Sequence, residues 1–266
     1  MSKPKNSRHD EIVEACRAND ETALGAILTI GGIDINCKNS LGLTPLVAAA
    51  EGGNVELVRL LLQNKADPNF PSTSGNYPLR AAITSGDGEC IMALVDAGAD
   101  LDMETARGTP LTSAASLGDV STITMLVDRG AKVDFETRGG VTPLMVATRE
   151  DQREAVRCLL QHGADPGVAS KDTGKSACDI AEELGLQEVY SLLMQKSIVS
   201  AASSALQDSD TRQQAAKRDR EAAAVAARQG LAQEAAVARE ENAARISSIK
   251  AESAELLARL GISKSK

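Results

Sequence analysis

The feature of this sequence that most constrains its fold is a short element that returns about every 33 residues. The element is a Thr or Tyr followed by Pro-Leu, and its copies begin at Thr44, Tyr77, Thr109 and Thr142. A second element keeps the same step, and its copies occupy 64–67, 97–100, 129–132 and 162–165. Two elements with one period indicate a chain of structural repeats, because a fixed period of roughly 20 to 50 residues is typical of stacked units.

Each repeat is predicted to be a pair of helices. Thr is a good N-cap and Pro is tolerated at the first helical position, so Thr44-Pro45 predicts a short helix that continues to about Ala50. Gly52-Gly53 ends this helix, and apolar residues at helical spacing follow from Val55 onwards. One such pair cannot bury its apolar face alone. Stacked neighbours make one continuous core, which is the architecture of a solenoid.

The period, the Thr-Pro-Leu that opens the first helix and the Gly-Ala-Asp that closes the second together resemble ankyrin repeats. The resemblance implies an all-α fold, an ankyrin-repeat solenoid of about six helix-turn-helix units that binds other proteins. We expect a polar leader at 1–8 and an array at 9–196. The predicted units of the array are 9–39, 40–74, 75–106, 107–139, 140–172 and 173–196, of which the first and the last diverge most from the pattern.

The chain departs from the family pattern at one position in each of the four recognisable repeats. The pattern places a His after Thr-Pro-Leu, and the residues found there are Val47, Arg80, Thr112 and Met145. The resemblance implies that this His ties neighbouring turns together, so we expect the loops to be held in another way. Lys65 also replaces the closing Gly and Tyr77 replaces the capping Thr. A non-Gly residue in the left-handed region costs on the order of 1 kcal/mol, so residues 65–77 are predicted to be the softest point of the array.

The sequence changes character after the predicted array. We expect a linker or capping segment at 197–210, a long Ala-rich helix or short coiled coil at 211–261, and a tail at 262–266. Four apolar residues follow coiled-coil spacing: Ile246, Ile249, Leu256 and Leu260. This seam extends for barely two heptads, so two alternatives stay open. The helix either pairs weakly with a second copy or with a partner, or stands in solvent and is supported by ion pairs within it.

The composition gives little material for catalysis. The chain has 2 His, 2 Tyr, 2 Phe and no Trp, so we expect no enzyme activity, no catalytic residues and no cofactor. The five cysteines form no C-x-x-C pair, which argues against a metal site and favours reduced thiols in the cytoplasm, with the nucleus as the alternative. No stretch approaches the roughly 18 apolar residues of a membrane span, so membrane insertion is not expected.

The net charge of −8 argues against a protein whose main ligand is nucleic acid. Residues 207–266 contain 11 basic and 9 acidic residues, so the acidity belongs to residues 1–206. An acidic array favours a basic protein partner. The alternative is that most of these carboxylates cap helices and keep the array soluble.

The resemblance implies that the concave face is made by the loop tips and by the exposed sides of the first helices. We therefore expect a protein partner to bind there, and the candidate contact residues are Met103, Glu104, Arg107, Leu117, Phe135, Glu136, Arg138, Arg149 and Glu150. Phe135 beside Arg138 is the predicted hot spot, because aromatic and Arg residues at the centre of an interface contribute most of its affinity. The alternative is that Phe135 packs at the base of its loop.

These observations predict a non-enzymatic adaptor that binds a protein partner through its array. The alternative is a regulatory subunit or inhibitor that covers an enzyme's surface with the same array.

Overall fold

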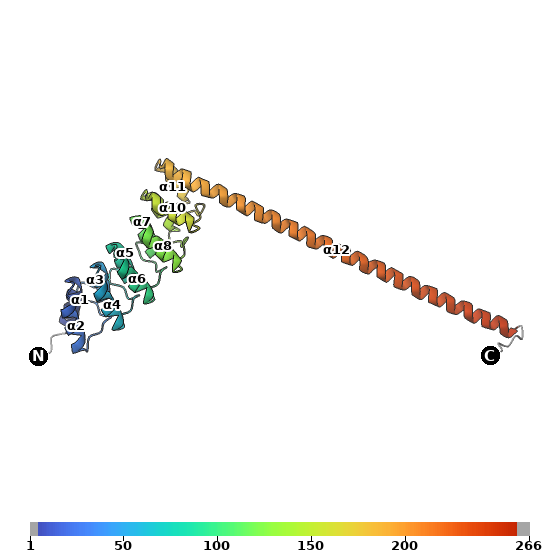
Figure 1. The fold of residues 1–266 in the computed structure, drawn as a ribbon, viewed down its shortest axis with the longest axis horizontal. Helices are drawn as coiled ribbons and strands as arrows, with labels where there is room; N and C mark the ends of the chain where they lie inside the picture. Colours follow the sequence, from blue (N-terminus) through green and yellow to red (C-terminus); the bar gives the residue numbers. More distant parts are fainter. Residues whose placement is uncertain (1–4, 260–266) are drawn as a thin grey trace. The chain divides into compact units, whose positions relative to one another are not determined.

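The computed structural model describes the backbone of residues 5–259, and the side chains of 8–198, 214, 217–222, 228–230, 233–248 and 250–255. The chain forms two compact units, residues 1–200 and 201–266. Figure 1 shows the helices of the first unit stacked one pair after another. The bounds of the helices are α1 Lys5–Arg17, α2 Glu21–Ile30, α3 Pro45–Glu51, α4 Val55–Gln63, α5 Pro78–Ser85, α6 Gly88–Asp96, α7 Pro110–Leu117, α8 Val120–Asp128, α9 Pro143–Arg149, α10 Arg153–Gln161, α11 Ala177–Glu183 and α12 Gln187–Arg259.

The first unit is the predicted all-α solenoid. Its first helices, α1, α3, α5, α7, α9 and α11, pack against one another in that order. The second helix of each pair packs against its own first helix and lies in the other layer, as α4 does against α3 and α10 against α9. The connecting loops between repeats contain only isolated bridges, such as the one between Thr105 and Gly108. The expected fold class is therefore confirmed.

One continuous core runs along the array between the two layers. The second helices supply large side chains that are fully buried, among them Leu57, Leu94, Leu126 and Leu159. The first helices supply buried alanines at 48–50, 81–82, 114–115 and 147, whose small side chains let neighbouring backbones approach closely. Each fully buried Leu contributes roughly 2 kcal/mol of hydrophobic stabilisation, so stacking adds stability with every repeat.

All three predicted Thr caps are confirmed. The Oγ1 atoms of Thr44, Thr109 and Thr142 accept hydrogen bonds from the backbone N–H three residues later, at 3.2, 3.2 and 3.3 Å. At the corresponding position, Tyr77 makes no side-chain cap bond. Lys65 adopts the left-handed conformation that the sequence predicts for it, with φ of 66°. Both losses that define the predicted soft point are therefore present.

A ladder of Asn and Asp side chains ties the first five repeats to one another. It consists of Asn36, Asn69, Asp102 and Asp134. Each side-chain oxygen accepts a hydrogen bond from a backbone N–H that lies 30 or 31 residues later, at 2.8 to 3.1 Å. We call this set the Asx ladder. Its bonds connect successive loops in an array that lacks the His of the family pattern.

Two expected boundaries differ in the structure. The predicted linker 197–210 is helical, and α12 runs through it without a break from Gln187. Asp208-Ser209-Asp210, which offers N-cap oxygens, lies inside this helix, because Asp and Ser are favoured at caps but tolerated in helix interiors. At the other end, α1 begins at Lys5, so part of the predicted leader 1–8 is helical.

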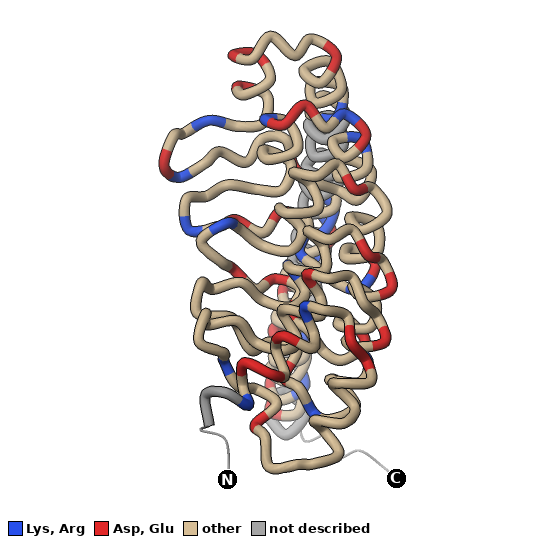
Figure 2. The backbone as a smooth tube through the Cα atoms, turned by 90° about the vertical axis from the view of Figure 1, so that its left-hand side faces the viewer, with Lys and Arg blue, Asp and Glu red and all other residues tan. Residues whose placement is uncertain are grey.

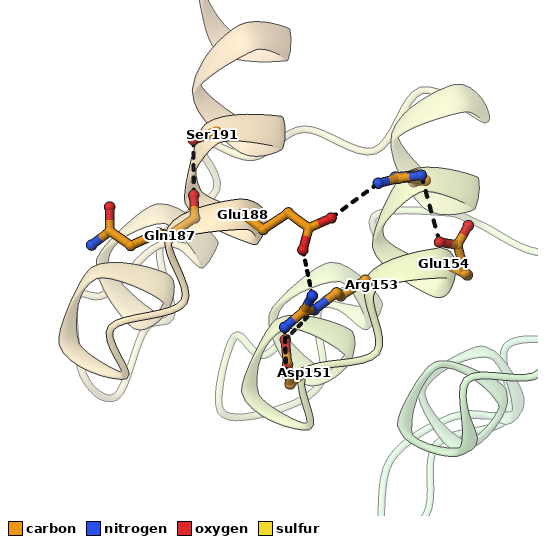
Figure 3. A network of polar contacts seen from close by, with 7 residues as sticks. Asp151, Arg153, Glu154, Gln187, Glu188 and Ser191 are labelled. Carbon is orange, nitrogen blue, oxygen red and sulfur yellow. Dashed lines mark hydrogen bonds and ion pairs between the residues drawn. The ribbon is translucent and has the colours of Figure 1, made fainter.

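The first turn of α12 is tied to α10 by ion pairs (Figure 3). Glu188 accepts hydrogen bonds from Arg153 and, at 3.4 Å, from Arg157. Arg153 also pairs with Asp151 at 3.3 Å. The side chains are about half exposed, so the network adds less than about 1 kcal/mol. The start of α12 at Gln187 is also held by the core, because α12 contributes the buried Val189 and Leu193 to the end of the array.

The coiled-coil seam stays a prediction. In the second unit, Ile246 is 54% exposed. The side chains of Ile249 and Leu256, and the whole of Leu260, lie outside the described residues.

Candidate protein-binding surface

A hollow of about 530 Å³ lies between the loops 104–108 and 137–141 and the helix α9. Four of the predicted contact residues line it: Glu104, Arg107, Arg138 and Arg149. They come from successive loops and from the end of a first helix, at positions one repeat apart. The structure therefore brings together residues that the sequence predicts for one surface.

Two smaller hollows, of about 240 and 230 Å³, continue this surface toward α5. Both are lined by Glu51, Asn76, Arg80 and Arg107. Arg107 therefore borders all three hollows. We call the surface formed by them the arginine groove, after its four arginines, Arg80, Arg107, Arg138 and Arg149.

Arg80 is the residue of the arginine groove that the sequence did not place in a binding site. It occupies the position at which the family has His, and the side chains there in neighbouring repeats, Val47, Thr112 and Met145, are buried. The guanidinium donates one hydrogen bond to Asn76 Oδ1 at 3.1 Å. Its Nε is buried and has no partner among the described residues. Burial lowers the pKa of Arg80, and repulsion from Arg107 lowers it further.

The other arginines of the groove differ in their pairing. Arg138 pairs with Glu104 across the repeat boundary, through its Nε at 3.6 Å and its backbone N–H at 2.6 Å. Arg149 pairs with the adjacent Glu150 at 3.4 Å. Neither Arg80 nor Arg107 has a carboxylate within ion-pair distance among the residues with described side chains. The groove thus holds two arginines, in the same two hollows, that have no ion-pair partner among the residues with described side chains.

Five of the predicted contact residues do not line these hollows, and their role in binding stays a prediction. Phe135 is half-buried, with Lys132 Nζ 5.7 Å from its ring centroid, and Glu136 pairs with Lys171 at 2.7 Å. Leu117 is 53% exposed at the end of α7. Met103 is half-buried, and Glu150 is the C-cap of α9.

Charged residues are distributed unevenly over the array. Figure 2 shows Lys and Arg, with some Asp and Glu among them, on several of the loops at its left-hand side, and a number of Asp and Glu along its right-hand edge. Some acidic residues on the second helices are paired across repeats, as Asp96 is with Arg129 at 2.5 Å and Glu89 with Arg59 at 3.5 Å. The net charge of the chain therefore does not describe the charge of its loop side.

The cysteines and the histidine of the array that could carry chemistry have structural positions. Burial raises the pKa of Cys16 and Cys90 to about 12, so these thiols are weak nucleophiles. Burial also raises the pKa of Cys178, at the start of α11. His162 is the C-cap of α10, and its Nδ1 lies 2.8 Å from the carbonyl oxygen of Cys158.

Within the described part of the chain, no group of three or more His, Cys, Asp or Glu is placed to hold a metal ion. No helix described in the structure is long and apolar enough to cross a membrane.

A family model described as "Ankyrin repeats (3 copies)" matches residues 12–105 and 98–170. The matched residues include the four Pro-Leu elements, the four copies of the second element and the whole arginine groove.

Curated relatives match parts of the array. The chain is 40% identical over 77 residues to the inactive serine/threonine-protein kinase TEX14 of Bos taurus, which covers 29% of this chain and 5% of that protein. It is 30% identical over 98 residues to the putative ankyrin repeat protein FPV244 of Fowlpox virus, a match that covers 37% of this chain and 15% of that protein. It is 38% identical over 69 residues to the mitochondrial disaggregase of Homo sapiens, and this match covers 26% of this chain and 10% of that protein. The chain thus spans only a small part of the length of these relatives.

A solved structure resembles the array more fully. It is a chain in the structure of the Bd0816 predatory endopeptidase from Bdellovibrio bacteriovorus in complex with immunity protein Bd3460. The TM-score is 0.63 and the identity is 26%, over 70% of this chain and 97% of that chain.

Proposed function

The chain belongs to the ankyrin repeat family, and from this premise we propose that it is a non-enzymatic adaptor that binds a protein partner on the loop side of its array. Ankyrin repeats are protein-interaction modules and are typically non-catalytic. Relatives that carry them are named for unrelated activities, such as a kinase-like protein and a disaggregase. The repeat therefore supplies binding, and exposed residues select the partner.

The observation that carries this proposal is the arginine groove. It extends across successive repeats without interruption, since its three hollows share Arg107. Its walls present charged side chains that are not used in the core. A surface that is hollowed, polar and built from several repeats suits the extended contact that a stacked array makes with another protein.

The second candidate function is that of a regulatory subunit or inhibitor whose array covers an enzyme's surface. The likeness to a chain from the complex of an endopeptidase with an immunity protein supports this candidate, because 97% of that chain is matched by the array fold. The two candidates share the binding surface. They differ in whether the bound partner loses activity.

The net acidity of residues 1–206 favours a basic partner, but the arginine groove supports a partner that binds the loop side instead. A basic partner would have to bind the acidic edge shown in Figure 2. Glu89 and Asp96, both on the second helix α6, already pair with arginines of the neighbouring repeats. We therefore place the partner on the loop side.

We also propose a reducing compartment, the cytoplasm or the nucleus, for this protein. The support is the state of the thiols, since Cys16, Cys37, Cys90 and Cys158 are free and buried in the core.

Affinity capture with the full chain tests the adaptor. The bait is compared with three surface variants, Leu117→Ser, Phe135→Ala and Arg138→Ala, and captured proteins are identified by mass spectrometry. Met92→Ser is the matched control, since Met92 is 45% exposed on α6 in the other layer. We expect a partner that the wild type and the control retain and that the surface variants lose.

Thermal unfolding of each bait separates lost binding from lost folding. A partner that all surface variants retain, and that a chain ending at residue 206 loses, would contradict the proposal and assign binding to α12. Adding the full chain to the identified partner then decides between the two candidates, because only an inhibitor lowers that partner's activity.

A further inference from the structure

The arginine groove contains an electrostatic arrangement that the fold does not require. Arg80 and Arg107 line the same two hollows, and Arg107 lowers the pKa of Arg80. Two like charges that have no carboxylate at ion-pair distance disfavour the folded array. The core position of Arg80 in other repeats is filled by an apolar or hydroxyl side chain, so the fold itself does not call for an arginine there.

The nearby carboxylate does not neutralise this pair. Glu51 lines the same hollows, but its Oε1 accepts a hydrogen bond from Asn76 Nδ2 at 3.0 Å. The Oδ1 atom of Asn76 accepts the hydrogen bond from Arg80. The amide of Asn76 thus lies between the two charged groups. Its Nδ2 donates to the carboxylate of Glu51, and its Oδ1 accepts from the guanidinium of Arg80. Apart from the buried Nε, the remaining donors of Arg80 and those of the Arg107 side chain have no partner among the described residues and are left for a ligand.

We propose that the arginine groove binds an acidic segment of the protein partner, with one of its carboxylates held between Arg80 and Arg107. This inference rests on the proposed function, because it names the chemistry of the partner at the same surface. A planar guanidinium matches a carboxylate with two parallel hydrogen bonds, and hydrogen bonds between charged groups are stronger than neutral ones. A bound carboxylate also removes the repulsion between the two arginines.

The shape of the groove favours an extended segment over a single small anion. Beyond Arg107 it opens into the hollow of about 530 Å³, a volume in the range of sites that enclose a ligand of several residues. Arg149 lines the far side of that hollow. A segment that places one carboxylate between Arg80 and Arg107 therefore meets a further arginine one repeat later.

The same residues disfavour a nucleic acid strand. Glu51 and Glu104 lie in the groove among the arginines and would repel a continuous row of phosphates. The lining contains no aromatic side chain on which bases would stack. Carboxylates on alternate residues of a peptide, by contrast, leave gaps opposite the two glutamates.

Fluorescence anisotropy with the full chain tests the proposal. The probe is a labelled short peptide of alternating Glu and Gly, compared with its Gln and Gly counterpart and with an oligothymidylate of similar length. We expect the Glu peptide to bind, more tightly at low than at physiological salt, and the Gln peptide not to bind. Arg80→Gln with Arg107→Gln should weaken binding by at least about tenfold, since hydrogen bonds to charged groups are lost.

Two matched variants show whether the fork geometry and the position matter. Arg59→Gln with Arg129→Gln makes the same change of net charge on the second helices, where both arginines are paired, and should leave the affinity within about twofold. Arg80→Lys with Arg107→Lys keeps the charge but loses the planar fork, and should fall between the wild type and the Gln variant. Circular dichroism melting shows whether each variant is folded.

Three outcomes would overturn the proposal: no binding of the Glu peptide by the wild-type chain, equal weakening by the control variant, or oligothymidylate binding as tight as that of the Glu peptide. Failure here is distinct from failure of the adaptor. If the peptide does not bind but the capture assay still shows a partner lost in the surface variants, the adaptor proposal is supported and the proposal of an acidic partner segment is wrong. If the peptide binds while capture depends only on α12, the acidic-segment site is supported and the proposal of an adaptor that binds through its array is wrong.

Discussion

Two neighbouring segments of the array occupy the same place in the repeat, and four of the positions at which they differ affect stability or the groove. The segment 65–80, which opens repeat 75–106, has Lys65, Asn69, Tyr77 and Arg80. The segment 98–112, which opens repeat 107–139, has Gly98, Asp102, Thr109 and Thr112 at the same positions. In the second segment Thr109 and Thr112 form a reciprocal capping box, with 2.7 Å from Thr109 N to Thr112 Oγ1. The first segment has neither the box nor a glycine at its left-handed position.

The difference indicates where the proposed groove costs the array stability. The box of segment 98–112 needs a side chain at position 112 that can accept the N–H of Thr109, and the equivalent position in segment 65–80 carries the arginine of the groove. A side chain cannot both close the cap and present a guanidinium to the loop side. Functional sites often retain locally unfavourable residues of this kind.

The largest expected effect is a difference in local opening. The left-handed Lys65 and the missing cap at Tyr77 each cost about 1 kcal/mol, so amides of 65–77 should exchange hydrogen roughly 30-fold faster than those of 98–109 and 130–142. Native-state hydrogen exchange resolved by residue measures this. Slower exchange at 65–77 than at 130–142 would contradict the comparison.

The next effect concerns the caps. Thr109→Val keeps the shape of the side chain but removes the oxygen that accepts the buried N–H of Thr112, and should lower the free energy of unfolding by about 1.5 kcal/mol. Tyr77→Phe should change it very little, because the side chain of Tyr77 makes no cap bond. Urea unfolding of both variants checks the pair. Equal losses would show that the two segments do not differ in capping.

The left-handed positions should respond in opposite directions. Lys65→Gly should raise the free energy of unfolding by about 1 kcal/mol, since glycine adopts this conformation without the Cβ penalty. Gly98→Ala should lower it by about the same amount: φ is 88° there and nothing lies within 4 Å of an added Cβ, so the cost is conformational. Thermal unfolding of the two variants measures both signs, and a loss from Lys65→Gly would show that its side chain makes a contact worth more than the strain.

The smallest expected effect concerns Asp134, the residue of the Asx ladder that lies two repeats after Asn69. Burial raises the pKa of Asp134, so its charged form is disfavoured in the folded state and stability falls as the pH rises through the unfolded value of 3.8 and then the folded value. Asp134→Asn keeps the acceptor for the N–H of Asp165. Because Asp134 is partly exposed, the gain at pH 7 should be only about 0.5 kcal/mol.

Urea unfolding at a series of pH values checks this sign. The advantage of Asp134→Asn should shrink as the pH is lowered toward 3.8. Glu182→Gln, at an exposed position of α11, is the control and should show no such trend. An Asn variant that is less stable at pH 7 would mean that the carboxylate makes a stronger bond to Asp165 than the amide does.

Repetition made most of the fold predictable. A Thr-Pro pair sets the start of a first helix by local chemistry, and four copies at one step define the period, so the solenoid follows from the sequence. The loop residues that line the hollow of about 530 Å³, Glu104, Arg107 and Arg138, also follow, because the period places them at neighbouring loop tips.

The rest depends on contacts between residues distant in sequence. Arg80 appears in the sequence only as a departure from a pattern, and its place beside Arg107 arises from the packing of two repeats. The Asx ladder is likewise invisible locally, since each bond spans 30 or 31 residues. The continuous α12 was missed because cap-favouring residues at 208–210 do not stop a helix whose start is held by Val189, Leu193 and Glu188.

The Asx ladder has a consequence for how the array unfolds. Every bond of the ladder connects adjacent repeats, and none reaches further along the array, so coupling passes only between neighbours. A chain of units coupled in this way can lose order in blocks. With its weakest junction at 65–77, denaturant should separate a short N-terminal block from a longer one that ends in the first turns of α12, and probes placed in the two blocks should report different midpoints.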